Sequence, residues 1–340
     1  MIKKLMQLLV IILILGASII NFSATVNSHT PEKIANLHDI QIGMSLSEML
    51  GLVGEPTHIE PTPYGYEWYI YNRDYHNYFQ IGVRDSMVVK IYSNSADWSF
   101  KGTAVGDYIS DVKNRLNFQD EIVFDYKNST LTLSPQGSGQ DWMYMHYHSK
   151  AGVDAKDVIA YYIYDNHNND RVTSMILGDV ESTLAGGDYG YHISWAGDRP
   201  EFGPEPISPE MQAKVDETIG YQFQDLINSI RVRKGLHPLD WHQGAAEIAA
   251  EHSRDMYYND FFAHDSPTTG SPGDRARSHG ISFSLFLENI AYGRNSPILT
   301  HEALMNSLGH RKNILREDIT AMGGAGYKNH KYTQKFLIPN

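Results

Sequence analysis

Apolar and polar positions divide the chain into a β-rich first part and a helical stretch that starts near residue 208. Strand-like runs such as "NYFQIGVRDSMVVKIYS" and "EIVFDYKNSTLTLS" predominate between about residues 35 and 185. From Ser208 onward, apolar residues including Val215, Ile219 and Phe223 recur at helical spacing behind a Ser-Pro start. The pattern predicts an α+β protein.

A second helix is predicted after Gly235, which ends the first one. Asp240 and Gln243 stand in a capping-box pattern, so we expect Asp240 to cap this helix. Its inner stripe includes His252 and Met256. We therefore interpret His252 as a core histidine that hydrogen-bonds to backbone, and not as part of a site.

An internal repeat marks the first part of the chain. "IGMSLSEML" and "VGDYISDVK" align through Gly43 and Gly106, and Ser47 and Ser110 are expected to cap the short helices that follow. β-rich sequence comes after each copy. We predict a domain over residues 35–185 that consists of two tandem helix-plus-β-hairpin repeats.

Glycine and proline concentrate between the two parts. The stretch "AGGDYGYHISWAGDRPEFGPEPISPE" predicts a linker over residues 186–207, and residues 208–340 then form the second domain. A chain of 340 residues is long enough for two domains with separate cores.

The first 24 residues form an export signal. Lys3 and Lys4 precede an apolar run from Leu5 to Ile20. A cleaved signal peptide is favoured over an N-terminal membrane anchor, and membrane contact is expected only through this segment if it is uncleaved. The predicted location is extracytoplasmic, either secreted or on the outer face of the membrane. The chain has no cysteine, so disulfides and thiolate sites are excluded.

Charge and local motifs exclude several classes of function. The formal net charge of -12 provides no basic surface for phosphate backbones, so we expect no nucleic acid partner. "HEALM" at His301 lacks the second histidine of a zinc helix, and no phosphate loop or nucleophile elbow is present. Spacing alone identifies no enzyme.

Several blocks, taken in order, resemble the CAP superfamily of cysteine-rich secretory, antigen 5 and pathogenesis-related proteins. They are "LINSIRVRKGLHPLDW", "AAEHSRDM", "FFAHDSP", "LENIAYG", "NSLGHRKNIL" and "YTQKF". The chain looks like the bacterial, cysteine-free branch, and the repeated part is similar to the CAP-associated N-terminal domain. The resemblance implies a three-layer α-β-α sandwich over residues 208–340.

The resemblance also implies a cleft in which two histidines and two glutamates can hold a divalent metal such as zinc. His264, Glu288 and His310 match three of these positions, but the second glutamate falls near Ser307. Leu287 and Leu304 depart from the glycine and tryptophan that the family usually has. Two imidazoles and one carboxylate would form an incomplete but possible metal site with an open position.

Structural alternatives remain for each of these residues. His264 and His310 could each make a hydrogen bond that pins a loop, and Glu288 could accept backbone N–H groups. Asn289 and Asn313 are expected to cap or pin turns.

Two aromatic runs and a pair of histidines in the first part of the chain can also be interpreted from the sequence. Aromatic runs at residues 68–71 and 161–164 are interpreted as sheet residues, with a carbohydrate platform as the alternative. His146 and His148 have a spacing that is compatible with a metal.

The favoured hypothesis is an exported binding or interaction module, with a small molecule, lipid, peptide or cell-wall component as its ligand. The alternative is a metal-dependent hydrolase of peptides or cell-wall material, in which His264, Glu288 and His310 hold the metal. A third hypothesis places an apolar ligand under the loop from Thr268 to Phe286, because "ISFSLFL" is apolar.

Overall fold

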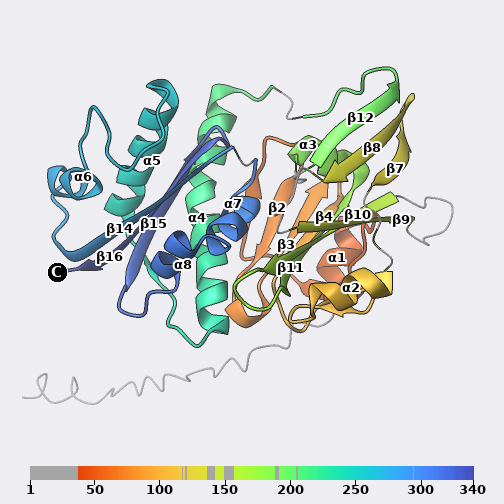
Figure 1. Ribbon diagram of the computed structural model, residues 1–340, viewed down its shortest axis with the longest axis horizontal. Coiled ribbons are helices and arrows are strands. Elements are labelled where there is room, and N and C mark those ends of the chain that lie inside the picture. Colours follow the sequence, from red (N-terminus) through yellow and green to blue (C-terminus); the bar gives the residue numbers. More distant parts are fainter. Residues whose placement is uncertain are drawn as a thin grey trace, which may run out of the picture. The chain divides into compact units, whose positions relative to one another are not determined.

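The computed structural model describes residues 37–116, 118, 121–135, 142–148, 157–187, 191–203, 206–293 and 295–340. Residues Ala35–Asn340 form one compact unit that contains every described element (Figure 1). We therefore expect this unit to fold without the first 34 residues, and the predicted signal peptide or anchor lies outside the described residues. Within the described ranges, no helix has the length and apolar character needed to cross a membrane.

The first part of the unit contains the predicted repeat. Helix α1 (Leu46–Val53) follows Gly43 and helix α2 (Ile109–Leu116) follows Gly106. Both glycines have positive φ, 88° and 101°, a region that disfavours other residues. The Gly43 N–H donates to Val88 O at 2.7 Å, and the Gly106 N–H donates to Val172 O at 2.8 Å. The same turn therefore introduces both helices, which confirms the tandem arrangement.

Strands of both repeats build one seven-stranded antiparallel sheet in the order β1-β2-β3-β4-β11-β10-β9. The bounds are β1 His58–Pro61, β2 Glu67–Tyr71, β3 Phe79–Arg84, β4 Met87–Ser93, β9 Trp142–His148, β10 Asp157–Asp165 and β11 Arg171–Asp179. The two repeats join where β4 pairs with β11. The short 3-10 turn η1 (Leu37–Asp39) precedes the first repeat, and η2 (Tyr75–Asn77) lies within it, between β2 and β3.

The aromatic runs of this sheet belong to its core. Trp68, Tyr71, Tyr161 and Tyr162 are all buried, as expected for sheet residues, so they form no exposed carbohydrate platform. The side chains of strand β9, which include the two histidines with metal-compatible spacing, lie outside the described residues.

A smaller sheet in the order β12-β8-β7 overturns part of the linker prediction. Its strands are β7 (Ile122–Tyr126), β8 (Ser129–Pro135) and β12 (Tyr191–Gly197). β12 falls within the predicted linker of residues 186–207, yet it pairs with β8 along its whole length. The glycines had obscured this strand because they lie at its flanks. Helix α3 (Val180–Gly186) and the hairpin of β5 (Ser99–Phe100) and β6 (Thr103–Ala104) complete this part.

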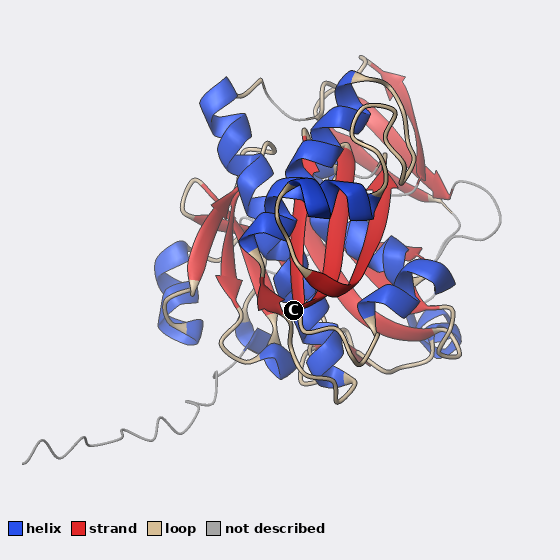
Figure 2. Ribbon diagram, turned by 90° about the vertical axis from the view of Figure 1, so that its left-hand side faces the viewer, coloured by secondary structure: helices blue, strands red, loops and turns tan. Residues whose placement is uncertain are grey.

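The second part is the predicted three-layer sandwich. Its sheet has the order β13-β15-β16-β14, with β13 Asp240–Trp241, β14 Phe283–Tyr292, β15 Ala321–Tyr327 and β16 Lys331–Pro339. Its helices are α4 Pro209–Arg233, α5 Gln243–Tyr258, α6 Pro272–Ser278, α7 Pro297–Met305 and α8 Leu308–Ile314. Helices α5 and α6 lie on one side of this sheet and α4, α7 and α8 on the other (Figures 1 and 2).

Neighbouring residues of β16 show how the layers pack. The ring of Tyr332 packs edge-on against Phe223 of α4, with 5.8 Å between centroids. The next residue, Thr333, points to the opposite face and accepts a hydrogen bond from Ser253 of α5 at 2.9 Å. This alternation is the normal geometry of a strand that is covered on both faces.

Three predicted helix caps differ from the structure. Ser45, and not Ser47, caps α1, because Ser45 and Glu48 form a reciprocal capping box. Ser110 lies inside α2. Asp240 lies in β13, where its N–H donates to Thr320 O, and His242 caps α5 instead. The cap of α4 by Ser208, with Pro209 in the first turn, is confirmed.

The two parts share buried contacts within the unit. Leu226, Ile298 and Leu299 belong to a core cluster that otherwise consists of residues from the first part. Arg311 of α8 forms two hydrogen bonds to Asp165 of β10, at 3.0 and 2.7 Å. The second part is therefore supported by the first and does not pack alone.

Candidate functional site

Three elements bring the predicted site residues to one region of the second part. His264 lies in the loop that follows α5, Glu288 in strand β14 and His310 in helix α8. His264 and His310 are 46 positions apart in the chain. In the structure they lie close enough for His264 to affect the pKa of His310. We call these three residues the His-Glu-His site.

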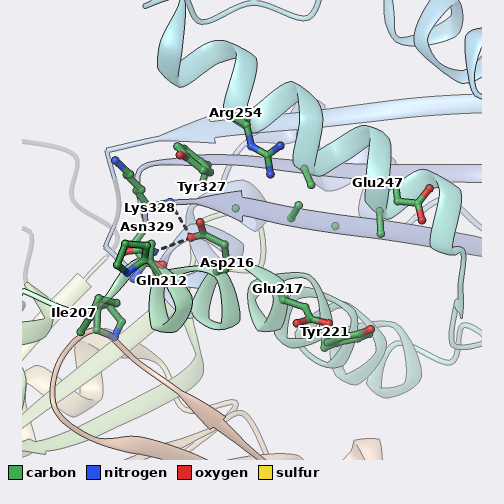
Figure 3. Close-up of a pocket in the computed structure, with 18 of the residues that line it drawn as sticks. Ile207, Gln212, Asp216, Glu217, Tyr221, Glu247, Arg254, Tyr327, Lys328 and Asn329 are labelled. Carbon is green, nitrogen blue, oxygen red and sulfur yellow. Dashed lines mark hydrogen bonds between the residues drawn. The ribbon is translucent and has the colours of Figure 1, made fainter.

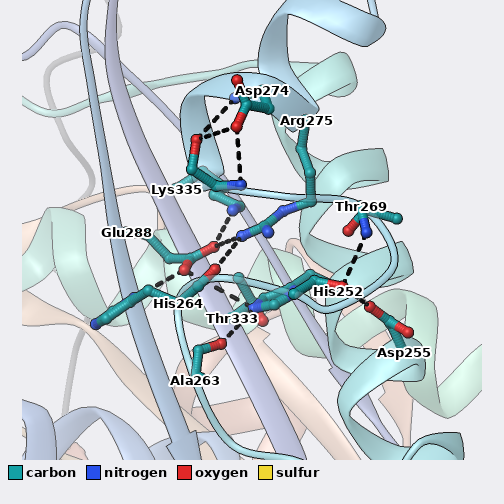
Figure 4. Close-up of polar contacts among 12 residues, drawn as sticks. His252, Asp255, Ala263, His264, Thr269, Asp274, Arg275, Glu288, Thr333 and Lys335 are labelled. Carbon is teal, nitrogen blue, oxygen red and sulfur yellow. Dashed lines mark hydrogen bonds and ion pairs between the residues drawn. The ribbon is translucent and has the colours of Figure 1, made fainter.

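Glu288 and His264 are in direct contact. The imidazole Nδ1 lies 2.8 Å from Glu288 Oε1 (Figure 4). The side chain of Glu288 is 1% exposed, whereas that of His264 is 52% exposed. Because an ionised carboxylate only accepts hydrogen bonds, Nδ1 carries the proton, and Nε2 is left for another partner.

Two buried cations also contact Glu288. Arg275 of α6 donates through Nη2 to Glu288 Oε2 at 2.8 Å. Lys335 of β16 lies directly opposite Glu288 in the β14–β16 register, and its Nζ donates to the same oxygen. The side chains of Arg275 and Lys335 are 3% and 0% exposed. Glu288 is therefore the shared anion of two buried cations, and its single charge balances one of their two.

The electrostatics keep this cluster charged at neutral pH. Burial alone would raise the pKa of Glu288, but the hydrogen bond from His264 and the positive charge of Lys335 outweigh it and lower the pKa to about 2. Burial lowers the pKa of Lys335 to about 8, although Glu288 acts in the opposite direction. The carboxylate shared between two cations thus stays ionised. The pKa of Lys335 stays below its usual value, because Glu288 offsets the effect of burial only in part.

His310 is held by the residue that replaces the family's second glutamate. Ser307 Oγ lies 2.9 Å from His310 Nδ1. Burial, followed by the electrostatic effect of nearby His264, lowers the pKa of His310, so this imidazole is neutral. Ser307 therefore positions the ring but adds no negative charge to the site.

Asparagines tie strand β14 to helix α8, whereas the sequence predicts that they cap or pin turns. Asn289 donates to His310 O and to Gln334 Oε1, both at 3.2 Å. Asn313 donates to Asn289 Oδ1 at 2.9 Å. These bonds fix α8 against β14 and so fix the backbone of His310 relative to Glu288.

His252 is a core residue, as predicted. Its side chain is fully buried in α5, and Nε2 lies 3.1 Å from Ala263 O. Burial lowers the pKa of His252 to about 4, so the ring is neutral, and it lies 3.8 Å from Glu288 Oε1.

The residues of the site do not fit a divalent metal. Its single carboxylate is already bound to two buried cations, and a metal would add two positive charges beside them. Ser307 supplies no compensating charge. In the described part of the chain, no group of three or more His, Asp or Glu could hold a metal ion. The geometry thus disagrees with the metal set of His264, Glu288 and His310 that the resemblance implied.

The apolar stretch near the site is partly buried and packs against core residues. Leu285 and Leu287 of β14 pack against the cluster around Phe336, and Phe286 packs against a second cluster with Ala245. Leu304, which stands where the family often has tryptophan, is buried in the first of these clusters. The proposed apolar ligand under residues 268–286 therefore has no support from this packing.

Arg275 and Lys335 are the site residues that sequence reasoning missed. A signal was present, because Lys335 shares one strand face with Thr333 and Leu337, which both point inward. A lysine on an inward strand face needs a buried anion, and Glu288 was the available candidate.

Comparisons with known proteins agree with this architecture. Residues 42–189 match the CAP-associated N-terminal family, and residues 224–338 match the Cysteine-rich secretory protein family. The chain belongs to the CAP superfamily, in a cysteine-free form with a CAP-associated N-terminal domain.

One bacterial relative matches most of the chain, and a second matches a third of it. The chain is 29% identical to the uncharacterized membrane protein YlbC of Bacillus subtilis, over 87% of this chain and 82% of that protein. It is 42% identical to the uncharacterized protein YkwD of the same organism, over 33% of this chain and 44% of that protein.

Two solved structures have the same fold. A crystal structure of an extracellular protein containing a SCP domain, from Bacillus anthracis, is 29% identical with a TM-score of 0.78, covering 90% of this chain and 96% of that one. A cysteine-rich secretory protein from Staphylococcus aureus is 18% identical with a TM-score of 0.70, covering 87% and 91% of the two chains.

Proposed function

We propose that this chain is an exported binding protein, which recognises a cell-surface ligand through the exposed face of the His-Glu-His site without a metal. The observation that carries the proposal is the pair of buried cations, Arg275 and Lys335, on the only carboxylate of the site. With its charge used in this way, Glu288 orients His264 and does not act as a metal ligand.

The ligand contact assigned to this site is His264 Nε2. Glu288 fixes the ring through Nδ1, and half of the His264 side chain is exposed. A fixed, exposed ring nitrogen without a proton can accept a directional hydrogen bond from a hydroxyl or an amide N–H of a ligand. Cell-wall material offers both groups, and the names of the relatives, a membrane protein and an extracellular SCP-domain protein, support a location outside the cytoplasm.

Sedimentation with purified Gram-positive cell walls tests the proposal. The unit Ala35–Asn340 is expected to pellet with the walls, and His264→Ala is expected to pellet less. His279→Ala is the matched control, because His279, which directly follows α6, pairs with Glu251 of α5 at 3.0 Å and lies outside the site. Equal pelleting of both variants would overturn the assignment of His264.

Zinc titration by calorimetry separates binding from metal-dependent hydrolysis. We expect the unchanged protein to show no stoichiometric zinc binding at His264 and His310, so that the His264→Ala, His310→Ala double variant gives the same titration. We also expect no soluble fragments to be released when the protein is incubated with cell walls. Stoichiometric zinc binding that depends on both histidines, together with released fragments, would replace this proposal by the metal-dependent hydrolase.

A further inference from the structure

A groove separate from the His-Glu-His site runs between α4 and α5. Its volume is about 1060 Å³, and none of His264, Glu288 and His310 lines it. We call it the β15-edge groove, because its floor is formed by Gly324, Ala325, Gly326 and Tyr327 of that strand (Figure 3).

The floor of the groove is the free edge of the sheet. β13 covers only the start of β15, where Asp240 pairs with Ala321 and Trp241 with Met322. His242 N–H donates to Met322 O at 2.7 Å, and the chain then turns away into α5. The position next to the rest of β15 is not filled by any strand in the described part of the chain.

Backbone groups on this edge lack partners. Since N–H and C=O groups alternate between the two sides of a strand, Gly324 and Gly326 face the same edge as Met322. Gly324 O lies against Gly220 of α4, where a Cβ would approach it to 2.2 Å. Among the described residues, no hydrogen bond is present for the Gly324 N–H or for the N–H and C=O of Gly326. Buried backbone groups of this kind are nearly always paired.

Small residues keep the groove open above and below this edge. Ala213 of α4 and Ala246 and Ala250 of α5 line its walls. An added strand would lie 4.7–4.9 Å from β15, roughly as in any sheet, and these alanines leave room for its side chains.

Charged side chains line the groove along its length. Glu217 and Glu247 lie toward one end, and the two cations Arg254 and Lys328 lie toward the other (Figure 3). Asp216 also lies at this second end, where it accepts a hydrogen bond from the Lys328 N–H at 2.9 Å. Arg254 lies over the ring of Tyr327 at 5.7 Å and makes no ion pair within the described ranges. β15 runs toward the basic end, so a strand parallel to β15 would place its amino end at the glutamates and its carboxyl end at the cations.

We propose that the β15-edge groove binds an extended peptide segment, which adds to the sheet parallel to β15 in the place where β13 stops. A basic group of the peptide contacts Glu217 and Glu247, and a carboxylate contacts Arg254 and Lys328. Strand addition to an exposed sheet edge is a recurring mode of peptide recognition. Backbone hydrogen bonds to Gly326 supply affinity, and the charged ends set direction.

Calorimetry with short synthetic peptides tests this inference on the unit Ala35–Asn340. The probe is Lys-Thr-Val-Thr-Glu with free termini. Glu247 and Arg254 are seven residues apart on a helix, or about 10 Å, and the Lys and Glu of the probe lie on the same side of an extended chain, about 13 Å apart. We expect it to bind at least about tenfold more tightly than Glu-Thr-Val-Thr-Lys. A Glu247→Lys, Arg254→Glu variant should reverse this preference.

Two controls locate the binding. Glu251→Lys makes the same charge change as Glu247→Lys on the same helix, but Glu251 pairs with His279 outside the groove, so peptide binding should be unchanged. Ala250→Phe fills the groove and should abolish binding, while circular dichroism and thermal unfolding report that the variant is folded. His264→Ala should bind the peptide as the unchanged chain does, which separates this site from the proposed function.

N-methylated peptides test the backbone contact. Methylation of the central valine nitrogen and of the threonine nitrogen that follows it should differ in effect, because only one of them faces β15. No binding of either charge order, equal effects of the two methylations, or binding that survives Ala250→Phe would overturn the inference. Binding of chitotetraose that is lost in Ala250→Phe, without peptide binding, would reassign the groove to a glycan.

Discussion

Removal of the charge on Glu288 provides a direct test of the buried cluster. In Glu288→Gln the side chain keeps its shape, but Arg275 and Lys335 lose their anion while they stay 3% and 0% exposed. Breaking a buried ion pair by removal of one partner leaves an uncompensated buried charge. We therefore expect a large loss of stability, and not the small effect that is usual for substitution of a surface residue.

The structure provides a magnitude for this loss. The pKa of Glu288 is lowered from 4.5 to about 2, and at about 1.4 kcal/mol per pKa unit the ionised form is favoured by about 3 kcal/mol. Removal of one partner from a buried pair typically costs about 3–5 kcal/mol. We expect Glu288→Gln to lower the free energy of unfolding by about 3–5 kcal/mol.

Lys335→Met is the contrasting variant. Burial has already lowered the pKa of Lys335 to about 8, and Arg275 and His264 still contact Glu288 after the substitution. Methionine fills the same space without a charge, so the loss should stay below about 1.5 kcal/mol.

Urea unfolding of the unit Ala35–Asn340 at pH 7, followed by circular dichroism and tryptophan fluorescence, measures both losses. The pH dependence provides an independent check. A lowered carboxyl pKa stabilises the fold above pH 4.5, and this contribution is lost as pH falls toward 2, so it should be absent in Glu288→Gln. If Glu288→Gln unfolds at the same urea concentration as Lys335→Met or higher, the account of the cluster is wrong.

Two further sites provide sharp expectations. Burial raises the pKa of Asp225 to about 6, so the unchanged protein loses stability as pH rises from about 4 to 6. Asp225→Asn does not titrate and should gain about 3 kcal/mol of stability relative to the unchanged protein over this range. Urea unfolding at pH 4 and pH 7 measures the difference. Gly220→Ala should cost about 1–3 kcal/mol, because its Cβ would lie 2.2 Å from Gly324 O. In Gly309→Ala of α8 the added Cβ meets nothing within 4 Å, so the variant should be more stable by up to about 1 kcal/mol and melt at a higher temperature. A loss of stability at Gly309 equal to that at Gly220 would contradict the packing argument.

Local signals predicted those parts of the fold that depend on neighbouring residues in the chain. Ser208 and Pro209 predicted the start of α4, and the matching glycines Gly43 and Gly106 predicted the repeat. A helix cap and a glycine turn both depend on backbone groups only a few positions away. β12 was missed for the opposite reason. Its place in the sheet is set by its pairing with β8, which lies about 60 residues earlier.

The site divides in the same way. Family blocks located His264, Glu288 and His310, whereas the cations that change the chemistry of the site were not located. Lys335 contacts Glu288 only because β14 and β16 pair in a register that places the two residues opposite each other. A one-residue shift of that register would turn the lysine to the other face. The sequence alone does not state the register, so the charge balance of the site could not be predicted.

The charge balance of the site connects Ser307 with the two buried cations. A second glutamate at the place of Ser307 would add an anion next to His310, and a metal or a proton would then be the usual way to balance two carboxylates in one site. Ser307 removes that need, while Arg275 and Lys335 already balance Glu288 from within the core. What remains is a pair of imidazoles held at Nδ1, one by a carboxylate and one by a hydroxyl, of which His264 is half exposed and His310 is partly buried. This arrangement is suited to directional hydrogen bonding, which is the basis of the binding function that we propose.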